Sequence, residues 1–331
     1  MLDGKSILVT GGTGSFGRRF VQSVLEKYTP TRLIVFSRDE QKHFDMAQTF
    51  DPETYPSIRY FIGDVRDRDR LEMAMRDVDF VVHAAAQKHV PLAEYNPFEC
   101  VHTNVLGAEH VVQAAIRNGV QRVVALSTDK AVNPINLYGA SKLASDKIFV
   151  AANNLSGAKG PRFSIVRYGN VIGSKGSVVP YFRRLVREGA DSIPLTDPRM
   201  TRFWITLDQG VEFVLSCLGG MLRGEISVPK IPSMRIVDLA EAIAPGMRHE
   251  CTGIRAGEKL HEVLVTEDDA RNTVELEDRY VILPGAVYWT KELEPIAGSQ
   301  PVSEGFRYAS DTNPQWLGRD RLEEILGELD E

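Results

Sequence analysis

Through its first half, the chain alternates short runs of β-branched and aliphatic residues with longer amphipathic segments. Strands that are apolar on both faces and alternate with helices are typical of a parallel sheet covered by helices on both sides. The pattern therefore predicts the α/β class, with a doubly wound parallel sheet of the Rossmann type. The predicted strands span 6–10, 32–36, 58–62, 79–83, 122–127 and 163–167, and the predicted helices span 14–27, 67–76, 98–118 and 137–154.

This alternation breaks after about residue 170. Glycine, proline and arginine become frequent there, which is typical of loops and of a small lobe rather than of another layer of sheet. A helix near 207–222 is expected to return to the main domain, and the chain ends in a short acidic helix. We expect a first domain over 1–170, with about 203–224 returning to it, and a smaller lobe over 171–202 and 225–331.

Composition narrows the class of protein. The chain has 331 residues, of which 43% are hydrophobic and 25% charged, and its formal net charge is −6. Nucleic-acid binding requires a basic face, so this balance argues against it. The three cysteines are far apart and outside any CxxC pattern, which fits a reducing compartment.

Targeting and metal-binding patterns are also missing from the sequence. The chain enters its first strand too early for a signal peptide, and its apolar stretches are too short or too interrupted for a bilayer span. The seven histidines form no ligand pattern such as HExxH. We therefore expect a cytoplasmic protein that binds no metal, no nucleic acid and no membrane.

The first predicted strand runs directly into a glycine-rich turn that opens a helix. The turn carries Gly11, Gly12, Gly14 and Gly17. Glycines let the backbone approach a pyrophosphate, and the amino terminus of the helix offers free N–H groups and a positive dipole end. This context predicts a dinucleotide site in the first domain. The alternative is a glycine-rich turn that binds no nucleotide.

The end of the second strand indicates which nicotinamide cofactor binds. An acidic residue there usually binds the ribose 2′-hydroxyl of NAD, whereas this chain has Ser37 and Arg38. A hydroxyl and a guanidinium suit a 2′-phosphate, so the sequence favours NADP. Two alternatives stay open: Arg38 is a solvated surface residue, or Asp39 binds the hydroxyl of NAD.

The ends of the next two strands extend this cofactor site. Asp64 follows the third strand, where a carboxylate can accept a hydrogen bond from the adenine amino group. Ala84 and Ala85 follow the fourth strand, where small side chains let a cofactor lie close to the backbone. The alternative for the alanines is that they begin a helix.

Candidate catalytic residues follow the fifth strand. Asp129 and Lys130 come directly after it, and Tyr138 and Lys142 lie in the next helix. Residues four apart share one face of a helix, so the Lys142 ammonium is expected beside the Tyr138 phenol. A cation there favours the phenolate and lowers the pKa of the tyrosine towards that of a general base.

These motifs together resemble a known superfamily. TGGTGSFG, YGASK and the strand order are similar to the extended short-chain dehydrogenase/reductases (SDRs). The segments FSRDEQK, AAAQKHV, STDKAVNPINLYGASK, RYGNVIGSKGSVVP, DPRMTRFWITL and GIRAGEKLHEV narrow the resemblance. They resemble the inverting UDP-N-acetylglucosamine 4,6-dehydratases that begin pseudaminic acid synthesis for flagellin glycosylation. The resemblance runs from about residue 4 to about residue 265.

The resemblance implies a reaction and a role for each catalytic residue. Tyr138 would take the proton of the sugar 4-hydroxyl while hydride passes to the nicotinamide. Lys130 would then take the proton on C5, and Asp129 would assist loss of the 6-hydroxyl. Hydride returns to C6, and protonation of the opposite face of C5 gives inversion. Retaining dehydratases typically carry Asp-Glu at the position of Asp129-Lys130, which makes this pair the sign of inversion.

The role of Lys130 as a base depends on its pKa. A lysine acts as a base only if burial or neighbouring cations lower its pKa. The alternative is that Lys130 pairs with Asp129 or with a substrate phosphate.

The resemblance also assigns the first domain to NADP, the smaller lobe to the substrate, and residues to each ligand. It implies a homo-oligomer as well. Residues expected at NADP are Gly11, Thr13, Gly14, Ser15, Phe16, Gly17, Ser37, Arg38, Asp39, Lys42, Asp64, Val65, Ala84, Ala85, Lys88, Leu126, Ser127, Tyr138, Lys142, Asn170 and Val171. Residues expected at UDP-N-acetylglucosamine are Lys88, Thr128, Asn170, Ser177, Thr201, Arg202, Arg255 and Glu258.

Two other functions stay open at this stage. One is a related UDP-sugar dehydratase–epimerase that serves capsule or O-antigen sugars. The other is a non-catalytic, NADP-sensing protein of the same fold. Such proteins often lose the tyrosine or the lysine, whereas Tyr138 and Lys142 are both present here.

Overall fold

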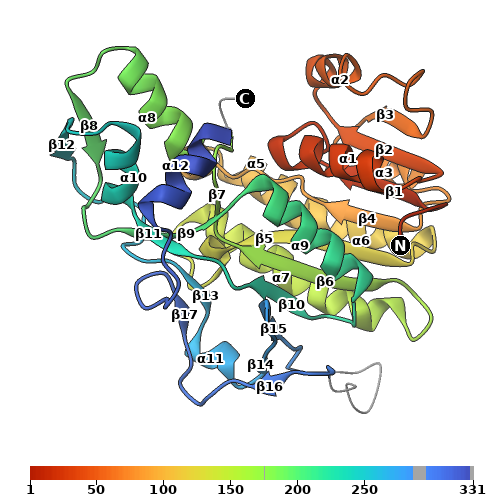
Figure 1. Ribbon diagram of the computed structural model, residues 1–331. Helices are drawn as coiled ribbons and strands as arrows, with labels where there is room; N and C mark the ends of the chain where they lie inside the picture. The colour runs from red at the N-terminus through yellow and green to blue at the C-terminus, as the bar shows by residue number, and fades with distance from the viewer. Residues whose placement is uncertain (175, 286–295, 329–331) are drawn as a thin grey trace.

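The computed structural model describes residues 1–174, 176–285 and 296–328. Within these ranges, ten strands form the main sheet in the order β16-β14-β15-β10-β6-β5-β4-β1-β2-β3. The seven strands from β10 to β3 are parallel, which confirms the predicted α/β class and the doubly wound sheet (Figure 1). The parallel strands are β1 (Ser6–Thr10), β2 (Arg32–Ser37), β3 (Ile58–Ile62), β4 (Phe80–His83), β5 (Arg122–Thr128), β6 (Arg162–Tyr168) and β10 (Ile226–Pro229).

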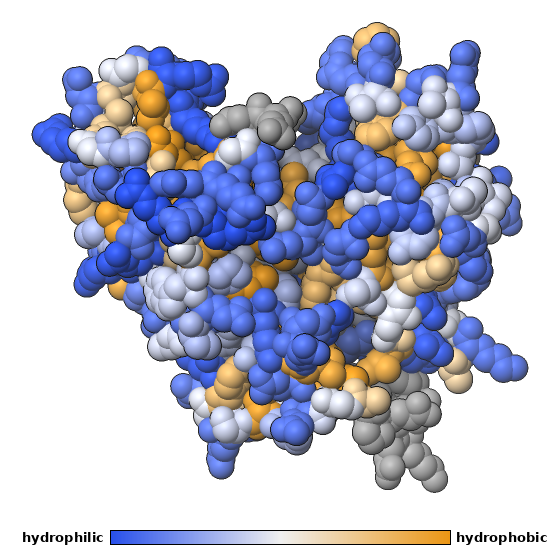
Figure 2. Space-filling view, in the orientation of Figure 1, coloured by the Kyte–Doolittle hydropathy of each residue, from blue (hydrophilic) through white to orange (hydrophobic). Residues whose placement is uncertain are grey.

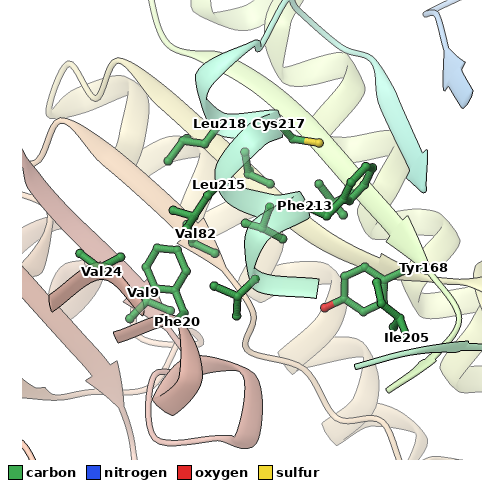
Figure 3. Close-up of a cluster of buried hydrophobic side chains, with 14 of the residues drawn as sticks. Val9, Phe20, Val24, Val82, Tyr168, Ile205, Phe213, Leu215, Cys217 and Leu218 are labelled. Carbon is green, nitrogen blue, oxygen red and sulfur yellow. The ribbon is translucent and has the colours of Figure 1, made fainter. Parts of the chain in front are cut away.

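Helices cover both faces of this sheet. On one face, α1 (Ser15–Lys27) and α9 (Leu207–Gly219) pack together, so the helix expected near 207–222 does return to the main sheet. Within β1, Ile7 and Val9 join the core under these two helices, whereas Leu8 joins the core on the opposite face. This alternation follows from the two-residue period of a strand. Figure 3 shows the first core, where Phe20 of α1 and Leu218 of α9 lie over the sheet.

The opposite face is covered mainly by α3, α6 and α7. The helix predicted over 98–118 is interrupted there, because His102–Leu106 (η1) forms a π-helical turn between α5 and α6. In this wide turn, Gly107 N–H donates to the carbonyl of His102, five residues back. The helices of the first half are α2 (Glu40–Ala47), α3 (Arg68–Ala74), α4 (Val90–Tyr95), α5 (Pro97–Val101), α6 (Gly107–Arg117) and α7 (Leu137–Ser156), and Asp129–Ala131 form a single 3-10 turn.

A smaller lobe stands beside the main sheet, at the left of Figure 1. Its core contains Phe182, Trp204, Leu239 and Leu322. The acidic helix expected at the end of the chain is α12, which packs into this core. The remaining elements are β7 (Asn170–Val171), α8 (Val178–Arg187), β8 (Ser192–Leu195), β9 (Thr201–Ile205), β11 (Ser233–Arg235), α10 (Ile236–Ile243), β12 (Arg248–Cys251), β13 (Val263–Val265), α11 (Glu267–Ala270), β17 (Tyr308–Ala309) and α12 (Arg319–Glu328).

The structure differs from the expected boundary between domain and lobe. Segment 225–331, which the sequence places in the lobe, adds β10 to the parallel sheet. It then adds β15 (Arg279–Ile282), β14 (Thr273–Glu275) and β16 (Gln300–Pro301) as antiparallel strands. These strands have two to four residues each, which is too short for a period of two to stand out in the sequence.

The surface in Figure 2 is mostly hydrophilic, with apolar residues scattered between polar ones. Within the described ranges, no helix is both long enough and apolar enough to cross a bilayer. In the same part of the chain, His, Cys, Asp and Glu side chains do not gather in groups of three or more that could hold a metal ion.

Candidate active site

A cavity of about 1020 Å³ lies at the carboxyl ends of strands β1 to β6. This is the edge at which ligands bind in doubly wound sheets. The cavity brings together residues that are far apart in sequence. The residues predicted from the sequence that line it are Gly11, Thr13, Gly14, Ser15, Phe16, Gly17, Ser37, Arg38, Lys42, Asp64, Val65, Ala84, Ala85, Lys88, Leu126, Ser127, Thr128, Lys130, Tyr138, Lys142, Asn170, Val171 and Ser177.

The glycine turn after β1 has the geometry of a phosphate cradle. Gly11 has φ +66°, and a Cβ atom there would lie 2.9 Å from the backbone nitrogen of Ala85. A Cβ atom on Gly17 would lie 2.5 Å from the backbone of Gly12. Helix α1 begins at Ser15, and its N-cap residue is Gly14, which has no side chain. Both residues line the cavity, so the positive end of the helix dipole lies close to an anion bound there.

Cationic and hydroxyl groups meet at the end of β2. The hydroxyls of Ser37 and Thr13 lie 2.8 Å apart, and the side chain of Arg38 is 59% exposed. Asp39 has a different role: it caps α2 by accepting from the N–H of Lys42, and it pairs with the Lys42 ammonium at 3.0 Å. Asp39 lies outside the cavity lining, so this arrangement presents two cations and a hydroxyl to a ligand.

The predicted adenine acceptor already has partners. Asp64 lines the cavity, and its Oδ2 accepts from Nε and a second nitrogen of Arg66 at 3.0 and 2.8 Å. Burial opposes the charged carboxylate, but the hydrogen bonds from Arg66 outweigh it and lower the pKa of Asp64. Asp64 is therefore an ionised acceptor.

Lys130 lines the cavity and forms an ion pair with Asp129. Lys130 Nζ lies 3.0 Å from Asp129 Oδ1 and 3.2 Å from Asn170 Oδ1. Asp129 is fully buried beneath the lysine, outside the cavity lining, and its Oδ1 also accepts from the hydroxyl of Thr128 at 2.8 Å. Its Oδ2 has no hydrogen-bond partner among the described residues.

The charge on Lys130 differs from the sequence expectation. Burial disfavours the ammonium, but the carboxylates of Asp129 and Glu262 outweigh this effect and raise the pKa of Lys130. The lowered pKa that a simple lysine base requires is therefore not found in this structure. The sequence gives no sign that Glu262 belongs to this site. Its Oε1 lies 3.6 Å from Lys130 Nζ.

Tyr138 and Lys142 both reach the cavity from α7, whose amino terminus is capped by Asn136. Burial raises the pKa of Tyr138 to about 12, and the charge of Lys130 acts against this rise. Lys142 was expected to supply that charge. Its ammonium instead donates to the carbonyl of Leu126 at 2.7 Å, and burial lowers its pKa. In this arrangement the cation that favours the phenolate is Lys130.

A second feature missed by the sequence is Asn104. Its carboxamide donates to the carbonyl of Gln87 and accepts from the Gln87 N–H, at 2.9 and 2.8 Å, and it also donates to Ser141. These bonds fix the loop after β4, which carries Lys88. Asn104 lies in the π-helical turn, a deviation that a helical sequence pattern does not reveal.

Two residues expected at the substrate are buried behind the cavity. Arg202 is 8% exposed and donates to the carbonyls of Thr201, Lys259 and Leu260. The hydroxyl of Thr201 lies within 2.8 Å of both His261 Nδ1 and the hydroxyl of Ser310. The guanidinium expected to hold a diphosphate is thus occupied by backbone carbonyls.

The other arginine of the expected clamp, Arg255, lies at the surface. The side chain of Arg255 is 60% exposed and lies 3.6 Å from Glu258. Both residues are outside the cavity lining, but their loop is tied to the site, because Asn136 donates to the carbonyl of Gly257 at 2.7 Å. The loop therefore adjoins the helix that carries Tyr138.

Comparison with known proteins shows the family to which this chain belongs. A family model described as "Polysaccharide biosynthesis protein" matches residues 7–284. The chain belongs to this family. It is also 56% identical over 331 residues to a protein of Campylobacter jejuni subsp. jejuni serotype O:2, named UDP-N-acetylglucosamine 4,6-dehydratase (inverting). The match covers 98% of each chain and confirms the resemblance seen in the motifs.

Solved structures agree with this membership. Pen from Bacillus thuringiensis superposes with a TM-score of 0.91 at 34% identity, over 100% of this chain and 99% of that one. DesIV, a dTDP-glucose 4,6-dehydratase from Streptomyces venezuelae solved with NAD and TYD bound, superposes with a TM-score of 0.69 at 26% identity. That match covers 77% of this chain and 86% of DesIV. This chain therefore has the extended SDR fold.

Proposed function

We propose that this protein is an inverting UDP-N-acetylglucosamine 4,6-dehydratase, a hydro-lyase that forms UDP-2-acetamido-2,6-dideoxy-β-L-arabino-hex-4-ulose. The observation that carries the proposal is the placement of Lys130 on the cavity wall, hydrogen-bonded to Asp129 and close enough to Tyr138 for its charge to act on the phenol. The inverting dehydratase named in the comparison, at 56% identity over nearly the whole chain, supports it.

A nicotinamide cofactor fits the cavity. The space kept open by Gly11 and the positive end of the α1 dipole suit a pyrophosphate, and NAD in the DesIV structure supports this class of cofactor. We infer NADP rather than NAD, because Arg38, Lys42 and Ser37 line the cavity where a 2′-phosphate would need cations and a hydroxyl. When bound, the nicotinamide would accept hydride from C4 of the sugar and return it to C6.

The residues of the chain would supply the proton transfers. Tyr138 would take the proton of the 4-hydroxyl as the ketone forms. In the resting state, Lys130 is an ammonium beside the Asp129 carboxylate. Transfer of one proton from Lys130 Nζ to Asp129 gives a neutral amine and a protonated carboxyl group. The neutral amine can take the C5 proton. The proton on Asp129 can reach the departing 6-hydroxyl through the hydroxyl of Thr128, which is hydrogen-bonded to Asp129 Oδ1 at 2.8 Å and lines the cavity. The elimination then returns the pair to its resting charges.

The assay for this function is product analysis by NMR. The protein is incubated with UDP-N-acetylglucosamine and NADP in deuterated water. The product should carry deuterium at C5 with inverted configuration, and retention at C5 would refute the assignment. A reaction that continues to further epimers would instead identify a dehydratase–epimerase.

Lys130→Ala tests the proposed base. Loss of a general base is expected to slow elimination about a hundredfold or more. NADP binding should persist, because the Gly11 turn and Arg38 are untouched. Lys147→Ala is a matched control, since Lys147 is exposed on α7 and lies outside the cavity lining. Full activity in Lys130→Ala would exclude Lys130 as the base.

The proposal extends to the setting of the enzyme. A 4-keto-6-deoxy sugar inverted at C5 is the expected first intermediate of pseudaminic acid biosynthesis for flagellin glycosylation. We further propose a cytoplasmic homo-oligomer. Detection of the keto sugar in cells, and its loss when the gene is deleted, would test the pathway assignment.

A further inference from the structure

Glu262 is a buried carboxylate that faces the catalytic lysine from another element of the fold. It is 2% exposed and directly precedes β13. Its Oε1 lies 3.6 Å from Lys130 Nζ and 4.0 Å from Arg202 Nε, and its Oε2 lies 3.4 Å from Lys259 Nζ. Among the described residues, no group donates a hydrogen bond to Oε2. An ion of this kind is costly to bury, so its charge must interact with its neighbours.

The backbone around Glu262 is fixed. Its N–H donates to the hydroxyl of Ser310 at 2.9 Å, and the N–H of Ser310 donates back to the Glu262 carbonyl at 2.8 Å. The Ser310 hydroxyl also donates to the carbonyl of Thr201. The main chain of Glu262 is therefore held at one place relative to β9.

Lys130 has charged neighbours from several elements. Asp129 and Glu262 favour its ammonium form, whereas Arg202 opposes it. Burial lowers the pKa of Lys88, and the charge of Lys130 lowers it further. The same charge acts on the phenol of Tyr138. Two carboxylates flank the amine, and only Asp129 lies within hydrogen-bond distance. Glu262 thus acts on the amine mainly through its charge.

We propose that Glu262 is a positioning residue, which holds the Lys130 amine between two carboxylates and makes it a stronger base towards C5. This inference rests on the proposed dehydratase function. A proton on a carbon next to a ketone is only weakly acidic, and a stronger base removes it with a more favourable driving force. The consequence is that a smaller share of Lys130 is neutral at any given pH.

Glu262→Gln removes the charge and keeps the size of the side chain. Removal of a negative charge near an ammonium destabilises that ammonium, so the pKa of Lys130 should fall. The active pair holds one proton, so its loss from Lys130 ends activity on the alkaline side of the pH profile of C5 deuterium incorporation. We expect this alkaline limb to move down by about one pH unit or more, which is a tenfold change in proton affinity. The maximal rate should fall as well, because the base is weaker.

Two variants act as matched controls. Glu225→Gln neutralises another buried carboxylate, which accepts from the N–H of Leu222 outside the cavity lining. It should leave the alkaline limb where it is in the parent. Glu262→Asp keeps the charge on a shorter side chain and should restore the limb at least partly towards the parent position. Circular dichroism and NADPH binding establish that each variant is folded.

A second measurement needs no turnover. NMR titration of lysine labelled with ¹⁵N at Nζ, with the Lys130 signal assigned by its loss in Lys130→Ala, reports the protonation of Lys130 directly. The signal should titrate at lower pH in Glu262→Gln than in the parent. An alkaline limb and a titration that both stay at the parent positions would overturn the role of Glu262, whatever the maximal rate. Absence of UDP-N-acetylglucosamine dehydration by the parent protein would instead overturn the proposed function, and the NMR titration would still decide the role of Glu262.

Discussion

The substitution Gly11→Ala tests whether the turn after β1 needs glycine for its backbone conformation or for the space beside it. Two costs are expected at this position. The first is the positive φ of +66°, which costs a residue with a Cβ atom about 1–2 kcal/mol. The second is steric, because the new Cβ atom would lie 2.9 Å from Ala85 N and 3.0 Å from Ala85 Cα. Those atoms belong to the backbone, so the end of β4 must move.

Gly119→Ala separates these two costs. Gly119 has φ +65°, almost the same as Gly11, but nothing lies within 4 Å of its added Cβ atom. It should therefore lose only the conformational term of about 1–2 kcal/mol in the free energy of unfolding. Gly11→Ala should lose more, and the difference between the two variants measures the steric term.

Urea unfolding and NADPH titration are the assays. Because Ala84 and Ala85 line the cavity, a shift of this backbone should weaken NADPH binding about tenfold or more in Gly11→Ala, or about 1.4 kcal/mol. Gly119→Ala should bind NADPH like the parent. Equal losses of stability in the two variants, together with equal NADPH affinities, would refute the close approach between the turn and β4.

Two further predictions concern cofactor choice and pH. Arg38→Ala should reduce the preference for NADPH over NADH about tenfold or more, because a charge-assisted hydrogen bond contributes about 1.5–3 kcal/mol; an unchanged ratio in parallel titrations, with exposed Arg271→Ala as the control, would count against a 2′-phosphate at Arg38. Burial raises the pKa of Glu225 to about 7, so the folded chain keeps a proton that the unfolded chain releases near pH 4.5, and stability is lost as pH rises between these values. Glu225→Gln should remove this loss. The free energy of unfolding of the variant minus that of the parent should therefore be up to about 3 kcal/mol larger at pH 8 than at pH 4. Equal differences in urea unfolding at the two pH values would contradict the shift in pKa.

The sequence predicted the parts of the fold that follow a regular period. The strands from Ser6 to Thr10 and from Arg122 to Thr128 are apolar on both faces, and their order with the helices determines a parallel sheet. The glycine turn was predictable for the same kind of reason, since a tight strand-to-helix turn leaves few other choices of residue. Short strands such as Thr273–Glu275 were not predictable, because their pairing depends on distant partners.

The candidate site, too, could be predicted from the sequence only in part. Tyr138 and Lys130 could be placed at one edge of the sheet, because parallel strands end together. The interactions of the side chains could not be deduced. Lys142 turns to a backbone carbonyl, Arg202 is surrounded by carbonyls, and Glu262 approaches Lys130 from a segment 132 positions later in the chain. Such contacts depend on three-dimensional packing and have no local signal in the sequence.

The π-helical turn at His102–Leu106 also sets the rotational phase of the helix that follows it. An α-helix turns by about 100° per residue, so one additional residue in a turn rotates everything beyond it by that amount. Here Asn104 points to Gln87, while Ala108, Val111 and Ala115 of α6 point to the sheet. Deletion of one residue would restore a regular helix, but it would turn either the carboxamide or the apolar stripe away from its partner. The length of this segment is therefore constrained by two contacts at once: that of Asn104 with Gln87 and that of the apolar face of α6 with the sheet. A chain shortened by one residue here would lose one of these contacts.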